Sequence, residues 1–275
     1  MSVVHHLNCG TMCPLAAPLL GQGGALRDRG RLVCHCLLLE TARGLVLVET
    51  GFGARDVATP AQLEAGFRAV AGPRLDRRET AIEQVRARGF QPEDVRHVVV
   101  THLDVDHAGG IADFPWATIH VHAREQQAAV ARRRRVDRRR YVPAHFAHGP
   151  RWQTYDEAGD QLFGLQAVRP LVGLDETIAL VPLFGHSRGH SGVAANVGGR
   201  WLLHAGDAFF HPDELARAAA LSARPAAVSG ARAARSTRPA RKPGEAAGAA
   251  RRAQRRGGGF CAHDPTALER LAKVA

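Results

Sequence analysis

The pattern of apolar and polar positions predicts a layered α/β protein. Residues 32–39 and 45–48 are nearly continuous apolar runs on either side of Gly44, and we expect them to pair as two strands of one sheet. Later apolar runs of strand length lie at residues 98–100, 118–122, 178–183 and 201–205. Stretches of helical length lie at residues 60–72, 79–88, 123–135 and 265–273. This alternation favours α/β layering in a single domain spanning residues 1–275.

Residues 216–258 break this pattern. The stretch consists almost entirely of Ala, Arg, Gly, Pro and Ser, and it contains no aromatic residue. Such a composition can bury little apolar surface, so the sequence predicts disorder there. We consider two origins: a variable insertion, or translation of the wrong reading frame in a GC-rich gene, with the original sense resuming near Phe260. The 35 Arg against two Lys in the chain fit GC-rich coding.

The formal net charge of +11 at first suggests a nucleic-acid partner. Its distribution argues against that interpretation, because residues 216–258 contain ten Arg and one Lys against the single acid Glu245. The rest of the chain is therefore close to +1, which is ordinary for an enzyme. A second arginine-rich run at residues 132–140 has few aromatic neighbours, so we interpret it as a solvated helix face rather than an anion site. We expect no nucleic-acid partner.

Targeting and cysteine usage indicate the compartment. No apolar run approaches the roughly 20 residues that a membrane span requires, and the first six residues lack the basic-then-apolar pattern of a signal peptide. We therefore expect no membrane partner and a cytoplasmic location. The cysteine count of five is odd, which argues against a disulfide framework. Cys34 and Cys36 alternate onto one face of the predicted strand 32–39, where we interpret them as small buried side chains.

The candidate chemistry begins directly after the predicted strand 98–100. Four metal-capable side chains fall within six residues and are followed by a Gly pair; they are His102, Asp104, Asp106 and His107. Neutral imidazole and carboxylate are ligands that zinc, iron and manganese accept. Histidine and aspartate are also common in surface loops, but four of them placed directly after a buried type of strand favour a metal site.

Three later segments add further candidates. His186 and His190 lie in a Gly-flanked loop, Asp207 follows the predicted strand 201–205, and His263 precedes the predicted helix 265–273. Each lies at a strand or loop end, where α/β proteins gather functional side chains. A single histidine of this kind is more often structural, so the prediction depends on their order and context together.

This order of motifs resembles the metallo-β-lactamase-fold hydrolase superfamily, and most closely its branch of acyl-homoserine lactonases. The resemblance runs from about residue 3 to 212 and resumes at 260–273. It includes Glu49-Thr50-Gly51, where the family usually has Asp-Thr-Gly. The resemblance implies an αββα sandwich, in which two mixed β-sheets lie face to face between helices and the metals bind at one edge.

The resemblance also implies a site for two divalent metal ions, with zinc as the expected metal. His102, Asp104 and His190 would hold the first ion, Asp106, His107 and His263 the second, and Asp207 would bridge them. His186 would support its loop. The implied activity is a metal-dependent hydrolase, in which metal-activated hydroxide attacks the carbonyl of a small ester, lactone or related acyl substrate. Asp106 would orient that nucleophile or pass a proton to the leaving alkoxide.

Two departures from the family pattern keep alternatives open. Asp104 stands where the family usually has His, which should weaken Lewis acidity and favour iron or manganese. Flavo-diiron relatives carry an acid at this position, so an iron-dependent oxidoreductase or dioxygenase is one alternative. Phe210 stands where the lactonases have Tyr, so a carbonyl-polarising hydroxyl is missing and other esters or amides enter consideration. A catalytically impaired chain, with His263 misplaced by residues 216–258, is a further alternative. The substrate and the oligomeric state stay open.

Overall fold

The computed structural model describes residues 3–156, 159–162, 165–167, 171–175, 177–210 and 258–273. The prediction of disorder at residues 216–258, and with it the choice between an insertion and a frame change, lies outside the described residues apart from Gly258.

The larger sheet has six strands in the order β1-β2-β3-β4-β5-β6. Their bounds are β1 (Val3–Met12), β2 (Leu32–Thr41), β3 (Gly44–Val48), β4 (Val95–Val99), β5 (Thr118–His122) and β6 (Arg151–Tyr155). Strands β1, β2 and β3 pair antiparallel, whereas β3 to β6 pair parallel, so the sheet is mixed. Gly44 has a φ of 110°, which lets the chain turn sharply between β2 and β3. The predicted hairpin is confirmed.

The smaller sheet has four strands in the order β12-β11-β10-β9. Their bounds are β9 (Ile178–Pro182), β10 (Ser191–Val197), β11 (Arg200–His204) and β12 (Gly259–Phe260). Strand β12 pairs parallel with β11 and the other pairs are antiparallel, so this sheet is also mixed. A separate hairpin joins β7 (Asp160–Leu162) and β8 (Leu165–Ala167).

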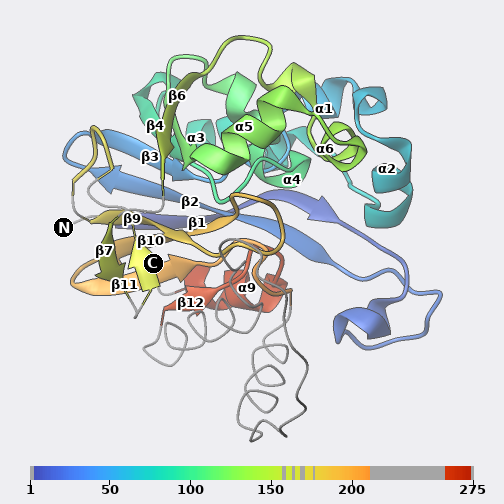
Figure 1. Cartoon of the computed structure of the whole chain (residues 1–275). Helices are drawn as coiled ribbons and strands as arrows, with labels where there is room; N and C mark the ends of the chain where they lie inside the picture. Colours follow the sequence, from blue (N-terminus) through green and yellow to red (C-terminus); the bar gives the residue numbers. More distant parts are fainter. Residues whose placement is uncertain are drawn as a thin grey trace, which may run out of the picture.

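Helices flank the two sheets, as the sequence predicts. The α-helices are α1 (Ala54–Ala58), α2 (Ala65–Ala71), α3 (Ala81–Ala87), α4 (Val105–Ala108), α5 (Ala123–Ala131), α6 (Arg135–Arg140) and α9 (Pro265–Ala272). The 3-10 segments are η1 (Ala17–Leu20), η2 (Pro60–Gln62), η3 (Arg77–Glu79), η4 (Pro92–Asp94), η5 (Gly109–Asp113) and η6 (Pro143–His145). Figure 1 shows α3 to α6 on one side of the larger sheet, and α9 on the opposite side of the molecule beside the smaller sheet. The layer order is αββα.

The core explains why residues 32–39 form a continuous apolar run. On β2, Leu38 lies in a buried cluster with Val85 of α3, on the helix side of the larger sheet. Its neighbours Leu37 and Leu39 point the other way. Both lie in the cluster between the sheets, with Leu180 of β9 and Val193 of β10. Because β2 is covered on both faces, apolar residues are required at successive positions rather than at alternate ones.

Two predicted helices are interrupted. In residues 60–72, η2 is followed by an extended Leu63, and α2 starts only after Glu64, whose carboxylate accepts a hydrogen bond from the backbone N–H of Phe67. In residues 123–135, α5 ends at Ala131 because Arg132 adopts the left-handed conformation, with φ 42°. A separate helix, α6, then carries the arginines from Arg135 to Arg140. Within the described ranges, no helix has the length and apolar character needed to cross a membrane.

Candidate metal centre

All seven predicted metal ligands gather at one edge of the sandwich. The loop that follows β4 carries His102 and Asp104, and α4 carries Asp106 and His107. His190 directly precedes β10, Asp207 lies in the turn after β11, and His263 lies in the segment between β12 and α9. Six of the seven are buried, and Asp104 is partly buried. Strands distant in the sequence thus end at one place, which is how α/β proteins commonly form sites.

One half of the centre is built around Asp207. Nε2 of His107 and Nε2 of His263 each lie 3.2 Å from Oδ1 of Asp207. Nε2 of His263 is also 3.6 Å from Oδ2 of Asp106. The other ring nitrogens are held from outside: Nδ1 of His263 donates to the carbonyl of Val33 over 2.8 Å. This leaves both Nε2 atoms facing the centre, the arrangement that a histidine ligand requires.

The other half is built around Asp104. Its Oδ2 atom lies 3.3 Å from Nε2 of His102, 3.0 Å from Nε2 of His186 and 3.0 Å from Nη1 of Arg140. Nε2 of His186 is also 3.6 Å from Oδ2 of Asp207. The structure therefore places His186 inside the cluster, whereas the family pattern gave it only a supporting part.

His190 is buried beside this half. Its Nδ1 donates to the carbonyl of Leu183 over 2.8 Å, and its Nε2 accepts from the backbone N–H of Asp207 over 3.0 Å. The close approach requires glycine at position 206, where φ is 54° and a Cβ would lie 2.7 Å from Nε2 of His190. In this arrangement both ring nitrogens of His190 already have hydrogen-bond partners.

The donor set fits bound cations. Within the part of the chain that the structure describes, four buried polar atoms of the cluster have no hydrogen-bond partner; they are Nε2 of His102, Oδ1 of Asp104, Nε2 of His107 and Oδ1 of Asp207. Buried polar atoms are normally satisfied, so this concentration is unusual. Two groups of three side chains also bring potential ligand atoms within 4.8 Å of one another: His102 with His186 and Asp207, and His107 with Asp207 and His263. Imidazole and carboxylate together suit zinc, iron or manganese.

The charges in the cluster reinforce one another. Burial opposes ionisation of Asp207, but His263 and His107 outweigh it and hold the pKa of that carboxyl well below its usual range. Burial likewise opposes ionisation of Asp104, yet His102, His186 and Arg140 lower its pKa far below the usual value. Both carboxyl groups are therefore ionised, which is the form that binds a cation.

Glu125, at the start of α5, links the two histidine loops and was not predicted from the sequence. Its buried carboxylate accepts from the backbone N–H of Leu103 and the hydroxyl of Tyr141 through Oε1, at 3.1 and 2.9 Å. Through Oε2 it accepts from the hydroxyl of Ser187 and the backbone N–H of Gly189, at 2.7 and 2.9 Å. A glutamate in a polar helix resembles any surface residue, so only the fold identifies it.

Glu49 and Cys34 also belong to the surroundings of the centre. Glu49 accepts from Nδ1 of His107 over 2.8 Å and thereby fixes the orientation of that ring. The sulfur of Cys34 lies with Asp106 and His263 in a third group of potential ligands, all within 4.8 Å of one another. Burial raises the pKa of the Cys34 thiol. The sequence predicts a small buried side chain at Cys34, and its burial is confirmed.

A cavity of about 230 Å³ opens directly beside the candidate ligands. Asp104 and Asp106 lie at one side of it, and its apolar lining comes from Leu63, Phe67, Val105, Val136 and Val142. Arg139 and Arg140 of α6 complete the lining with Glu64. On the other side of the centre, the ring of Phe210 stacks on His263, with centroids 5.6 Å apart and an interplanar angle of 7°.

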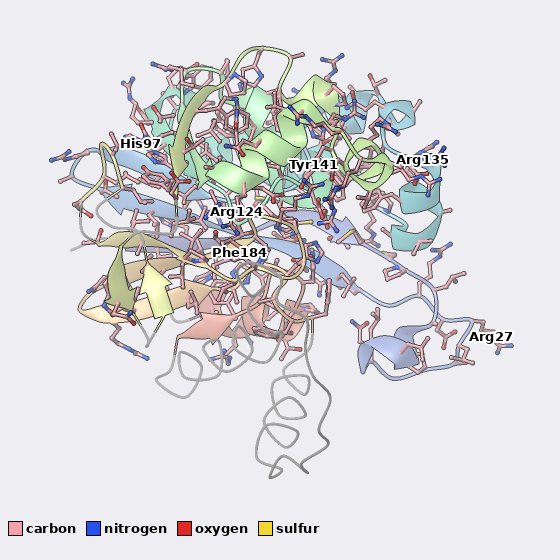
Figure 2. All side chains as sticks on the ribbon, in the orientation of Figure 1. Arg27, His97, Arg124, Arg135, Tyr141 and Phe184 are labelled. Atoms are coloured by element: carbon pink, nitrogen blue, oxygen red, sulfur yellow. The ribbon has the colours of Figure 1, made fainter. Side chains whose placement is uncertain are left out.

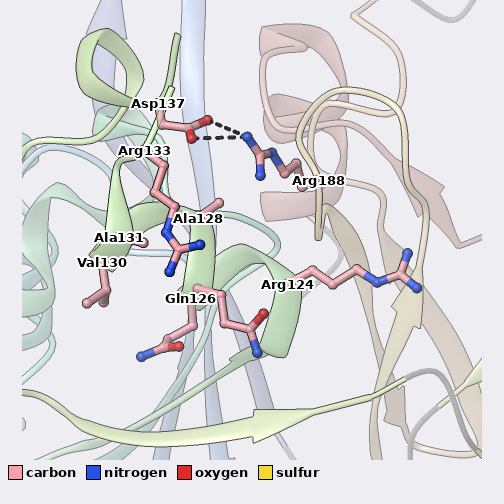
Figure 3. Close-up of a pocket in the computed structure, with 9 residues that line it drawn as sticks. Arg124, Gln126, Ala128, Val130, Ala131, Arg133, Asp137 and Arg188 are labelled. Carbon is pink, nitrogen blue, oxygen red and sulfur yellow. Dashed lines mark hydrogen bonds and ion pairs between the residues drawn. The ribbon is translucent and has the colours of Figure 1, made fainter. Parts of the chain in front are cut away.

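A larger cavity of about 580 Å³ lies away from the candidate ligands, over α5. Figure 3 shows Arg124, Arg133 and Arg188 around it, with Arg188 turned toward Asp137 of α6. Arg188 lies 3.0 Å from Oδ2 of the buried Asp137, and this ion pair fastens the loop that carries His186 and His190. In Figure 2, Arg124 and Phe184 lie where the helical layer meets that loop, and the guanidinium is 5.1 Å from the ring centroid.

Residues 29–248 match the family model of the metallo-beta-lactamase superfamily. The chain is 44% identical over 208 residues to a protein named "Probable metallo-hydrolase" in Mycobacterium tuberculosis, a match covering 76% of this chain and 63% of that relative. The chain thus spans somewhat less than two thirds of that relative's length. It is 30% identical over 165 residues to an N-acyl homoserine lactonase of Agrobacterium fabrum, covering 56% of each chain.

Solved structures share the same fold. One is an N-acyl homoserine lactone hydrolase with the product N-hexanoyl-L-homoserine bound at its catalytic metal centre; its TM-score is 0.65, at 20% identity over 97% of this chain and 95% of that one. A variant of B. thuringiensis AiiA, with N-decanoyl-L-homoserine bound at its active site, has a TM-score of 0.67 at 20% identity, with the same coverage. These similarities confirm the predicted αββα fold.

Proposed function

The chain belongs to the metallo-β-lactamase superfamily, and we propose that it is a metal-dependent hydrolase of a small ester, lactone or related acyl substrate. The observation that carries the proposal is the convergence of four buried potential ligand atoms that make no hydrogen bond within the described residues, on His102, Asp104, His107 and Asp207, beside a cavity with an apolar lining. The metallo-hydrolase and lactonase names of the relatives support the same class of reaction.

The proposed ligands follow the family pattern. His102, Asp104 and His190 would hold a first divalent ion, and Asp106, His107 and His263 a second, with Asp207 shared between them. His190 would bind through Nε2, in place of the hydrogen bond that this atom accepts from the backbone N–H of Asp207. Zinc is the proposed metal, because imidazole and carboxylate are its usual ligands and its bound forms suit hydrolysis. The 3.2 Å between Nε2 of His263 and Oδ1 of Asp207 supports including His263 among the proposed ligands.

The chemistry divides between the ions and the chain. The bound ions would polarise the substrate carbonyl and lower the pKa of the attacking water. Asp106 faces the same space, with Oδ2 within 3.6 Å of His263, and would accept the proton of that water or return it to the leaving oxygen. Glu49 and the carbonyl of Val33 hold His107 and His263 in place through Nδ1. These contacts keep the centre preorganised.

The cavity indicates what part of the substrate enters. Its lining is mostly apolar, with cationic groups at one side, and it opens onto Asp104 and Asp106. We propose that it takes the apolar acyl portion of the substrate while the carbonyl lies at the metal centre. Phe210 has no hydroxyl to offer the carbonyl, so polarisation would depend on the ions.

The predicted absence of a nucleic-acid partner and the cytoplasmic location stay predictions.

The test combines metal analysis with a substrate panel. Purified protein is assayed for bound zinc, iron and manganese, and then for hydrolysis of esters, lactones and β-lactams with each metal added. Two zinc ions per chain and ester or lactone hydrolysis are expected. His107→Ala should abolish hydrolysis and lower the metal content, and unchanged activity in that variant would contradict the proposal.

A second candidate, an iron-dependent oxidoreductase, is favoured by Asp104 alone. The carboxylate of Asp104 lies beside the imidazole of His102, and a carboxylate combined with imidazoles is the ligand set of non-haem iron sites. Iron as the bound metal, with oxygen consumption in place of hydrolysis, would favour this candidate in the same panel.

A further inference from the structure

We propose that His186 is an additional ligand of the first metal ion, and that it supplies the imidazole that this chain lacks at position 104. The inference rests on the metal centre of the proposed function and goes beyond its family-based ligand set. It concerns which side chains complete the half of the centre built around Asp104.

The position of the His186 ring is that of a ligand. Its Nε2 atom lies 3.0 Å from Oδ2 of Asp104 and 3.6 Å from Oδ2 of Asp207. Two ligands of one tetrahedral zinc ion, each about 2.0–2.1 Å from it, are separated by a little over 3 Å. The ring also lies beside that of His102, with centroids 4.7 Å apart. His102, His186 and Asp207 are one of the groups whose potential ligand atoms converge.

The loop of residues 185–190 is held so that the ring of His186 faces Asp104 and Asp207. Directly after it, Ser187 and Gly189 are bound by the carboxylate of Glu125, and Arg188 is bound by Asp137. Glu125 and Asp137 are both buried, so these anchors are shielded from solvent. The loop is therefore fastened by its other residues.

The same anchors make a purely loop-supporting role unnecessary for His186. In the part of the chain that the structure describes, the ring nitrogens of His186 make polar contacts only with Asp104 and Asp207. By contrast, His190 uses Nδ1 for the carbonyl of Leu183 and Nε2 for the backbone N–H of Asp207. Of the two imidazoles in this loop, that of His186 has an Nε2 atom that faces Asp104 and Asp207 and makes no backbone contact within the described residues.

Arg140 explains why an added imidazole would be needed. Its Nη1 atom lies 3.0 Å from the same Oδ2 atom of Asp104 that faces His102 and His186. A carboxylate shared with a guanidinium donates less electron density to a cation than a free one. Position 104 thus holds an aspartate, where the resembled family usually has histidine, and this aspartate is partly neutralised by Arg140. A nitrogen donor from another loop would compensate for the weaker ligand.

The first experiment replaces His186 by glutamine. The amide of His186→Gln can still donate a hydrogen bond to Asp104 but is not an effective zinc ligand. Metal per chain is measured by elemental analysis after equilibration at a series of buffered free-zinc concentrations, and the absorption spectrum is recorded with cobalt in place of zinc. We expect the affinity of one site to fall by about tenfold or more, with a changed cobalt spectrum. His148→Gln, at an exposed histidine, is the matched control and should leave both readouts unchanged.

The second experiment returns the imidazole to position 104. The combined variant Asp104→His with His186→Gln should recover the lost affinity, which also shows that the loop still folds. Two ions bound with unchanged affinity by His186→Gln would overturn the inference, as would a loss that Asp104→His does not repair. Absence of metal from the unsubstituted protein would instead overturn the proposed function itself, so the two failures are distinguishable.

Discussion

The carboxylate of Glu49 accepts a hydrogen bond from Nδ1 of His107 over 2.8 Å, while its other oxygen accepts from the backbone N–H of Thr101. One side chain thus sets both the orientation of a candidate ligand and the path of the loop that begins the metal motif. Glu49 is buried and has φ 64°, a left-handed conformation that is uncommon for a residue with a side chain. The surrounding structure maintains this conformation, in which the carboxylate faces His107.

Glu49→Gln should lower metal affinity by about 10- to 100-fold. Both partners of Glu49 donate hydrogen bonds, so the amide nitrogen of glutamine would face a donor whichever way it turned. Isothermal titration with zinc measures the change. Glu40→Gln, at the partly exposed partner of His5, is the control and should leave zinc affinity unchanged. Equal affinity in the Glu49 variant and the control would show that His107 needs no such orientation.

Glu125→Gln should destabilise the fold by about 2–4 kcal/mol, because a buried carboxylate with four donors would be replaced by a group with one acceptor oxygen. Urea unfolding followed by circular dichroism measures the free energy of unfolding. Glu83→Gln is the matched control, since within the described residues the ion pairs of Glu83 are with the exposed Arg77 and Arg86, and we expect a change of less than about 1 kcal/mol there. A similar loss of unfolding free energy in both variants would show that Glu125 does not stabilise the fold by linking the two loops.

Val136→Trp should narrow the cavity beside Asp104 and raise KM for substrates with long acyl chains more than for short ones. Val136 lies on α6 and is 57% exposed, so the larger side chain can be accommodated without disturbing the core. Val130→Trp is a close control, because Val130 is equally exposed at 57% but lines the larger cavity over α5. Steady-state kinetics with a series of acyl lengths separates the two. The same KM pattern in both variants would place the acyl group elsewhere.

Asp113→Asn should stabilise the protein near neutral pH and have no effect in acid. Burial raises the pKa of Asp113 to about 6, against a hydrogen bond from the backbone N–H of Ala54 that lowers it. The folded state therefore keeps this proton to a higher pH than the unfolded chain does, so the wild-type protein loses stability as pH rises from about 4 to about 6. Asparagine keeps the acceptor oxygen without the charge. We expect a gain of about 1–2 kcal/mol at pH 7.5 and none at pH 4, measured by urea unfolding. A gain that is constant with pH would contradict this explanation.

The parts of the fold that the sequence predicted are those governed by local patterns. Strands β2 to β5 lie where apolar runs occur, and Gly44 marks the turn between two of them. The prediction was wrong where tertiary contacts decide the backbone. In residues 60–72, the side chain of Leu63 is buried and its backbone is extended, and this extended residue interrupts the helix. The left-handed Arg132 ends α5 without any glycine or proline to signal it.

The candidate site likewise combines features that follow from local sequence with features that depend on tertiary contacts. The spacing of His102, Asp104, Asp106 and His107 is a property of one short segment, so the sequence by itself could single them out. The sequence also determined the order of the later ligand segments and the fold class that brings them together. Those features depend on residue type and on distance along the chain, which are visible without coordinates.

Only the tertiary structure decided which side chains hold the candidate ligands in place and which imidazole faces Asp104. Glu125 binds the loops of Leu103 and Ser187 although they are far apart in the chain, and the carbonyl of Val33 orients His263 across more than two hundred residues. Such contacts have no local signature, because they arise only when both sheets are packed. The position of His186 belongs with them: its ring direction is set by the anchors of its loop, and those anchors exist only in the folded chain.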